Sequence, residues 1–296
     1  MRAWKVAGCA REKSRKTRAK IQIDVQIGMG SGAMAILAEE CYADSRWGPF
    51  DSERMMADAA ANETVEYDGN DLEALSVLKN YQDWIFARVA PWLGGTAAEL
   101  GAGIGSFSAM LADRVDSLDA IEPSAALHMR LKQNAGALGN VRVLSQTAES
   151  WLAAAPPAQY DCVVMINVLE HIRDDSAVLD GIFAALKPGG RLIVFVPALQ
   201  FLFSNIDRQV GHFRRYERAA LTSVLTGAGF RIADLRFFDI LGILPWLVMN
   251  TWLGKTEFNP DMVGLYDRIG VPATRAFESI VTPPIGKNLI AVAVKD

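Results

Sequence analysis

The chain has 296 residues, and 51% of them are hydrophobic, so it can bury the core of one large domain or of one domain with appendages. Its formal net charge is −4, but residues 1–20 hold eight of the 30 Lys and Arg residues and only one of the 34 Asp and Glu residues. The remainder is therefore strongly acidic, which argues against a nucleic acid as substrate. The three cysteines show neither paired nor metal-ligand spacing, which favours a reduced, cytoplasmic protein and gives no support for a metal site.

Residues 1–33 are predicted to be a basic, disordered leader. The segment lacks the continuous apolar stretch of a secretory signal, and Met34 is a candidate start of the ordered protein. Binding of nucleic acid or of anionic lipid, and a targeting role, are alternative uses of the same charges.

Residues 34–93 are predicted to form a helical cover. Tyr81 and Trp84 begin an apolar stripe at helical spacing, and Pro91 ends the pattern. An amphipathic helix packed on a sheet explains the stripe by itself.

A glycine-rich turn follows directly. The short apolar strand 97–100 contains Glu99 and leads into Gly101, Gly103 and Gly105, after which a helical pattern begins. Glycines at this spacing allow a sharp turn and a close approach of the backbone to a nucleotide-like ligand, and the helix N-terminus adds unpaired N–H groups. A tight strand-to-helix turn without a ligand is the alternative.

Further strands follow in alternation with helical segments. The strand 118–121 ends at Glu122, a carboxylate at the position where doubly wound folds hold ribose hydroxyls. Other apolar, β-branched runs lie at residues 141–144, 160–167 and 191–196. This order predicts an α/β fold with a doubly wound, mostly parallel sheet and helices on both faces. A nicotinamide-binding oxidoreductase is an alternative, but its fingerprint places the third glycine three residues after the second, and here Gly103 and Gly105 are two apart.

The ordered motifs resemble those of the class I S-adenosylmethionine-dependent methyltransferases, and the resemblance covers roughly residues 80–296. The segments that carry it are Glu99-Leu100-Gly101-Ala102-Gly103-Ile104-Gly105, Ile121-Glu122-Pro123, Asp161 through His171, and Leu186-Lys187-Pro188-Gly189-Gly190. The resemblance implies a seven-stranded sheet with an antiparallel last strand, and S-adenosyl-L-methionine as the cofactor.

It also implies where the cofactor lies. By resemblance, the glycine-rich turn with Glu99 lines the methionine and ribose end, and Glu122 holds the ribose hydroxyls. Ala148 is expected near the adenine and Asn167 near the reacting centre. Tyr81 is expected to close over the cofactor.

A polar loop at residues 205–216 is the most distinctive segment after the fifth strand. It contains Asp207, His212, Arg214, Arg215 and Tyr216, and its Asp-x-x-x-Gly-His-x-Arg-Arg-Tyr pattern resembles one bacterial branch of the same methyltransferases. That branch usually has Ser or Thr at position 217, whereas this chain has Glu217.

The loop and the fourth strand supply the candidate catalytic groups. His171 and His212 are each a candidate base for a hydroxyl acceptor, because loops beyond the carboxyl ends of strands lie over the ligand crevice. Structural hydrogen bonds, with Asp207 as the partner of His212, are the alternatives. Asp207, Arg214, Arg215 and Tyr216 are candidate substrate-binding residues, and the two guanidinium groups suit an anionic acceptor.

Residues 240–287 are predicted to be a hydrophobic insertion in a core formed by residues 94–239 and 288–296. Its segment 240–253 contains no charge, but it is too short to span a bilayer. A lid over the acceptor site, a peripheral membrane contact and a dimer contact are the three interpretations, and the lid ranks first.

The expected function is methyl transfer from S-adenosyl-L-methionine to a small or lipid-linked acceptor, at oxygen rather than nitrogen. The enzyme is expected in the cytoplasm or at a membrane surface. A non-catalytic adenosyl-ligand-binding protein on the same fold is the alternative from another class.

Overall fold

The structure is a computed structural model that describes residues 78–256 and 260–296. The predicted leader, 1–33, and residues 34–77 of the predicted cover lie outside the described residues.

A seven-stranded sheet in the order β3-β2-β1-β4-β5-β7-β6 organises the described part of the chain. Neighbours among the first five strands pair in parallel, and β7 pairs antiparallel with both β5 and β6. The predicted α/β fold with an antiparallel last strand is therefore confirmed. The strands are β1 (Thr96–Leu100), β2 (Ser117–Ile121), β3 (Val141–Leu144), β4 (Tyr160–Ile166), β5 (Leu186–Pro197), β6 (Arg231–Phe238) and β7 (Asn288–Val294).

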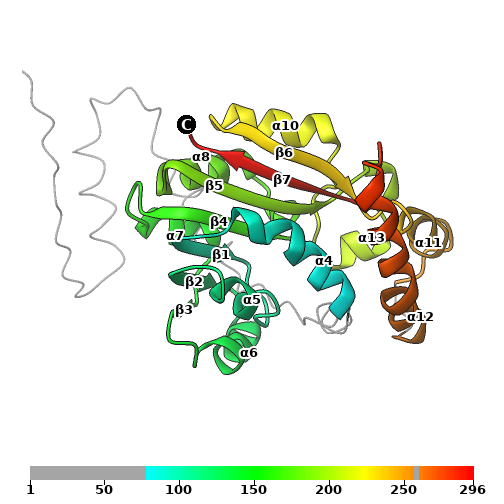
Figure 1. Cartoon of the computed structure of the whole chain (residues 1–296), viewed down its shortest axis with the longest axis horizontal. Coiled ribbons are helices and arrows are strands. Elements are labelled where there is room, and N and C mark those ends of the chain that lie inside the picture. The colour runs from blue at the N-terminus through cyan, green and yellow to red at the C-terminus, as the bar shows by residue number, and fades with distance from the viewer. Residues whose placement is uncertain (1–77, 257–259) are drawn as a thin grey trace, which may run out of the picture. The chain divides into compact units, whose positions relative to one another are not determined.

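Helices cover both faces of this sheet (Figure 1). Side chains alternate along β4, so Val163 and Met165 pack into one apolar cluster while Cys162 and Val164 pack into another on the opposite face. Helices α7, α8 and α10 contribute to the first cluster, and α4 and α5 to the second. Their bounds are α4 (Lys79–Val89), α5 (Ser108–Ala112), α6 (Ala125–Ala135), α7 (Ala148–Ala154), α8 (Asp175–Ala185) and α10 (Arg218–Gly227).

The largest difference between a predicted and an observed strand boundary is at the start of β5. β5 begins at Leu186 rather than Arg191, and β7 begins at Asn288. The Gly189 N–H donates to the Lys295 carbonyl, and the Lys295 N–H donates to the Gly190 carbonyl. These two hydrogen bonds make Gly189 and Gly190 part of the sheet. The local sequence does not reveal this pairing, because Lys295 is far away in the chain.

Short elements fill the connections at the carboxyl ends of the strands. They are η2 (Leu169–His171), η3 (Gln200–Leu202) and α9 (Asn205–Gln209), whereas η1 (Ala90–Trp92) leads into the amino end of β1. The insertion between β6 and β7 forms α11 (Ile243–Trp246), the π-helical η4 (Leu247–Trp252), α12 (Pro260–Leu265), the π-helical η5 (Tyr266–Gly270) and α13 (Val271–Ile280).

The insertion gathers at one end of the sheet, beyond the carboxyl end of β6 (Figure 1). Because β5 and β6 both run antiparallel to β7, this is also the end at which β5 stops. In a doubly wound sheet, ligands bind beyond the carboxyl ends of the strands. Within the described residues, no helix is both long and apolar enough to cross a membrane.

Candidate active site

The glycine-rich turn lies between β1 and α5, and its backbone requires glycine. Gly101, Gly103 and Gly105 have φ values of +67°, +59° and +86°. A Cβ atom on Gly101 would lie 2.4 Å from Cγ2 of Val168, and one on Gly105 would lie 2.9 Å from Cδ1 of Leu131. Left-handed backbone and the lack of space together exclude larger residues at Gly101.

The turn is fastened to the tip of β2 by Glu122. Its carboxylate accepts hydrogen bonds from the backbone N–H groups of Gly103, at 2.9 Å, and Ser124, at 2.8 Å. Burial raises the pKa of Glu122 although the two N–H donors oppose the shift. A carboxylate accepts about four hydrogen bonds, so Glu122 keeps capacity for the hydroxyl groups of a ligand.

A second carboxyl group, Glu99, lies under the same turn. It is buried and accepts a hydrogen bond from the Ser108 hydroxyl. Burial raises its pKa to about 8. A cationic ligand group beside it would favour its ionised form.

These residues line a cavity of about 710 Å³. Its wall includes most of the predicted cofactor-binding residues, namely Glu99, Gly101, Gly103, Glu122, Ala148, Asn167 and Tyr81. Gly105 is not part of the wall and instead packs against α6 through Leu131. Asn167 has a φ of +53°, and its N–H donates to the Phe195 carbonyl, which fixes the end of β4 at the cavity.

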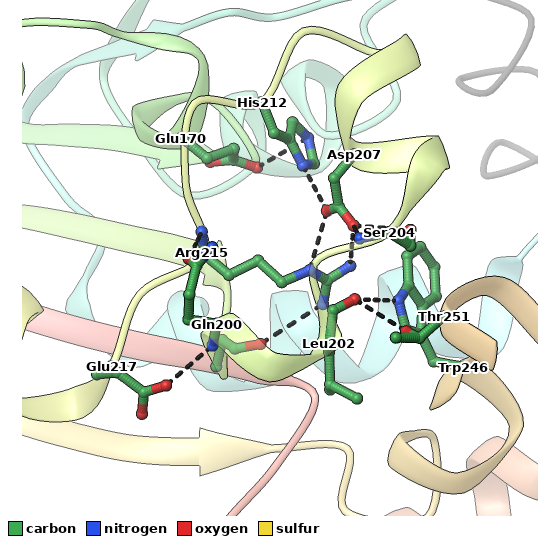
Figure 2. A network of polar contacts seen from close by, with 11 residues as sticks. Glu170, Gln200, Leu202, Ser204, Asp207, His212, Arg215, Glu217, Trp246 and Thr251 are labelled. Atoms are coloured by element: carbon green, nitrogen blue, oxygen red, sulfur yellow. Dashed lines mark hydrogen bonds and ion pairs between the residues drawn. The ribbon is translucent and has the colours of Figure 1, made fainter. Parts of the chain in front are cut away.

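On the other side of the cavity the polar loop forms a buried network around Asp207 (Figure 2). Its carboxylate accepts hydrogen bonds from the Ser204 N–H at 2.7 Å and the Ser204 hydroxyl at 2.8 Å. It also contacts Nδ1 of His212 at 2.8 Å and accepts from Nε of Arg215 at 2.9 Å. Burial opposes ionisation of Asp207, but the His212 hydrogen bond and the Arg215 charge lower its pKa to about 2.

His212 and His171 both line the cavity, with ring centroids 4.5 Å apart. Burial first, and His212 second, lower the pKa of His171 to about 4, so its imidazole is neutral at neutral pH. Nε2 of His212 faces Oε1 of Glu170 at 3.8 Å (Figure 2). Glu170 is fully buried, and burial raises its pKa to about 8.

One group in the described part of the chain could hold a metal ion. Glu170, His171 and His212 each offer a ligand atom, and these atoms lie within 4.8 Å of one another. Ligand spacing along the chain does not indicate this group, because Glu170 and His171 come from one connection and His212 comes from another.

The remaining predicted substrate-binding residues lie elsewhere. The Arg214 guanidinium binds Asp175 at 2.6 Å and the Arg173 carbonyl at 2.7 Å, and the Tyr216 hydroxyl binds the same Asp175 oxygen at 2.6 Å. Neither side chain belongs to the cavity wall. The structure therefore brings Asp207, His212 and Arg215 together and directs Arg214 and Tyr216 to α8.

Glu217 stands where the resembled branch usually has Ser or Thr. It is the N-cap residue of α10, but its side chain makes no capping hydrogen bond. Its carboxylate instead accepts from the Gln200 N–H at 2.9 Å (Figure 2).

Trp246 and Lys287 are among the residues of the cavity wall that no sequence motif indicates. The Trp246 ring lies 4.5 Å from the Arg215 guanidinium carbon, and its indole N–H donates to the Leu202 carbonyl at 3.0 Å. Neither residue belongs to a motif, and their position depends on how the insertion folds back on the sheet.

Comparison with known proteins matches residues 78–235 to the family model described as the methyltransferase domain. The chain belongs to this methyltransferase family. Its motifs and its seven-stranded sheet place it among the class I enzymes, whose methyl donor is S-adenosylmethionine.

Curated relatives carry the name ubiquinone biosynthesis O-methyltransferase. The Pseudomonas entomophila protein is 27% identical over 176 residues, which are 54% of this chain and 72% of that protein. The Xanthomonas campestris protein is 27% identical over 220 residues, which are 68% of this chain and 88% of the relative.

Solved structures share the fold. The methyltransferase bound to the Trm112 activator of Haloferax volcanii superposes with a TM-score of 0.54 at 16% identity, covering 78% of this chain and 97% of that chain. A methyltransferase of Bacillus halodurans gives a TM-score of 0.51 at 14% identity, covering 71% and 97%.

The cavity of this methyltransferase fits its cofactor. Because Gly101 has no side chain, a ligand can approach the backbone of the turn closely. The Glu122 carboxylate can still accept hydrogen bonds from hydroxyl groups of a ligand. Glu99 supplies a buried carboxyl group that a cation would ionise.

Proposed function

We propose that this enzyme methylates a hydroxyl oxygen of a lipid-linked acceptor, with His212 as the base. The observation that carries the proposal is the contact between Nδ1 of His212, a residue of the cavity wall, and the buried carboxylate of Asp207 behind it. Relatives named O-methyltransferases at 27% identity support oxygen as the methylated atom.

The cofactor supplies an activated methyl group on a sulfonium, so the protein needs to align the acceptor, exclude water and remove one proton. Nε2 of His212 would take the hydroxyl proton as the acceptor oxygen bonds to the methyl group and the sulfur–methyl bond of the cofactor breaks, which leaves a neutral thioether. Asp207 holds the ring through Nδ1–H and stabilises the resulting imidazolium, because its own pKa of about 2 keeps it ionised.

His171 has a different role in this proposal. Its pKa of about 4 makes it a poor proton acceptor at neutral pH. A hydrogen bond with the Val210 backbone orients its ring. We infer that it positions the acceptor beside His212.

The exposed apolar surface of the insertion supports a lipid-linked acceptor taken from a membrane surface. Trp252 is 70% exposed, and Leu253, Leu244 and Ile269 are more than half exposed. Surfaces of this kind mark interaction sites, and Trp is typical of the membrane interface. In this proposal residues 240–287 are a lid on the core and residues 240–253 contact the membrane.

The loop pattern from Asp207 to Tyr216 fits the bacterial branch that it resembles. Asp207 and Arg215 fix the base, while Arg214 and Tyr216 anchor the loop to Asp175. The loop thus serves the reaction by holding His212 in place.

A panel of long-chain alcohols and phenols, with matched amines, tests the proposal. The enzyme is incubated with S-adenosylmethionine, and methylated products are identified by mass spectrometry. We expect ether products that disappear in His212→Gln. The control is His128→Gln, because His128 lies on α6 outside the cavity wall. Methylation of amines alone would overturn the proposal.

A further inference from the structure

A second cavity adjoins the cofactor cavity. Its volume is about 1140 Å³, and its walls come from the insertion, chiefly η4, α12 and η5. The two cavities share Leu78, Tyr81, Trp246 and Lys287. The chamber built by the insertion therefore lies against the cofactor cavity, with these four residues between them.

The chamber suits an apolar chain. Apolar side chains such as Met249, Leu253, Val263 and Ile269 line it, and no Asp or Glu occurs among its described lining residues. Two of its lining residues, Leu253 and Ile269, also belong to the exposed apolar surface of the insertion. An apolar chain that entered from this surface would have its head group at the shared wall.

Lys287 is the cation at that shared wall. Its ammonium forms an ion pair with Asp239 at 2.9 Å, and its side chain is 19% exposed. The aromatic rings of Tyr81, Trp246 and Tyr266 surround it, with centroids 5.1, 5.9 and 5.8 Å from Nζ. Aromatic faces stabilise a cation in place and keep it dry.

Asp239 fixes the position of this ammonium. Its carboxylate is fully buried and accepts hydrogen bonds from the Gly242 N–H and the Tyr266 hydroxyl, and its carbonyl accepts from the Lys287 N–H. An ammonium has three N–H donors, and Asp239 is its one polar partner recorded among the described residues. Donors therefore remain for an oxygen atom in the cavity.

The other cations of the cofactor cavity are already engaged. Arg215 binds Asp207 through Nε and Nη2, and the Arg173 guanidinium lies over the ring of Phe213 at 4.7 Å. Of the three cationic residues in the described wall, only Lys287 also faces the second cavity.

We propose that Lys287 binds an oxyanion on the head group of the acceptor, while the apolar chain of the acceptor occupies the second cavity. This proposal rests on the proposed function and specifies its substrate class, an anionic amphiphile. It also moves the anion-binding role from Arg214 and Arg215, where the sequence suggested it, to a residue outside every motif.

Binding calorimetry on the full chain saturated with S-adenosylhomocysteine tests this without turnover. The probes are dodecanoate, butyrate and dodecanol. We expect dodecanoate to bind at least tenfold more tightly than either of the other two, because only dodecanoate offers both the charge and the chain.

Variants separate the two parts of the site. Lys287→Gln keeps a hydrogen-bond donor for Asp239 but loses the charge, and we expect it to weaken dodecanoate at least tenfold and dodecanol less than twofold. Met249→Trp narrows the chamber and is expected to weaken both long-chain probes while Lys287 stays intact. Lys132→Met, on α6 outside both cavities, is the matched control.

Three outcomes would overturn the proposal: equal affinity for dodecanoate and dodecanol, no effect of Lys287→Gln, or no effect of Met249→Trp. The proposed function fails separately, if the panel of alcohols and phenols gives no ether. Binding of S-adenosylhomocysteine in each variant shows that the fold is retained.

Discussion

We assign to the cofactor the half of the cavity that contains the glycine-rich turn and Glu122, where a hydrogen bond joins the Gly103 backbone to the carboxylate at the tip of β2. We assign to the acceptor the half that contains the side chains of Trp246 and Lys287, which both come from the insertion between β6 and β7. A local backbone turn suits a ligand that every member of the family shares. Side chains brought together by an insertion can change without disturbing that turn, so they suit an acceptor that differs between enzymes.

The largest expected effect is on the backbone of the cofactor half. Gly101→Val places side-chain atoms where Val168 lies and holds a β-branched residue at a φ of +67°. Left-handed backbone costs roughly 1–2 kcal/mol and overpacking about 1–3 kcal/mol. We expect calorimetry to detect no S-adenosylhomocysteine binding by Gly101→Val. Gly139→Ala is the control, since a Cβ atom there meets nothing within 4 Å.

The second largest effect is expected on the rate of methyl transfer in the acceptor half. His212→Gln removes the base, and general bases contribute about 10²–10⁴-fold. We expect kcat to fall within that range while the affinity for S-adenosylhomocysteine changes less than twofold. A parallel fall in cofactor affinity would show that the two halves are not separable and would contradict the comparison.

The buried carboxyl group of Glu170 is expected to make the free energy of unfolding depend on pH. Its pKa in the folded protein, about 8, lies above the ordinary value of 4.5, so it contributes stability at low pH that is lost as the pH rises through 8. Glu170→Gln does not titrate, and we expect its free energy of unfolding to exceed that of the wild type at pH 8 by on the order of 4 kcal/mol. Denaturant unfolding at pH 4, 6 and 8 measures the difference, which should vanish near pH 4.

The charge of Asp207 should change the stability with pH in the opposite direction. Its folded-state pKa of about 2 lies below the ordinary 3.8, so its contribution is present above pH 4 and is lost as the pH falls through 2. We expect this contribution to be about 2 kcal/mol and to be absent from Asp207→Asn. Acid unfolding of both proteins between pH 5 and pH 2 checks it; parallel curves would mean that Asp207 does not stabilise the loop through its charge.

Local patterns in the sequence predicted the parallel strands, the left-handed glycine turn and the acidic tip of β2. These features depend on neighbouring residues: alternating apolar side chains form strands, and only glycine fits the backbone at Gly101. The start of β5 was predicted five residues late, because its first residues are held by hydrogen bonds from the chain end, at Lys295.

For the candidate site, the sequence indicated the polar loop at residues 205–216. It did not indicate which groups the side chains of the loop bind. Arg214 and Arg215 are adjacent and chemically identical, yet one binds Asp175 on α8 and the other binds Asp207 beside the cavity. The direction of each side chain follows from the path of the loop over η2 and α8. Charge and spacing along the chain carry no information about that path.

By itself, then, the sequence of this methyltransferase determined the fold, the family and the position of the cofactor turn, because each depends on short-range pattern. The tertiary structure decided which cations face the cavity, which histidine contacts a buried carboxylate and that the insertion encloses a second chamber. These properties arise from contacts between segments as far apart as Tyr81 and Asn288, which only the folded chain brings within 2.6 Å of each other.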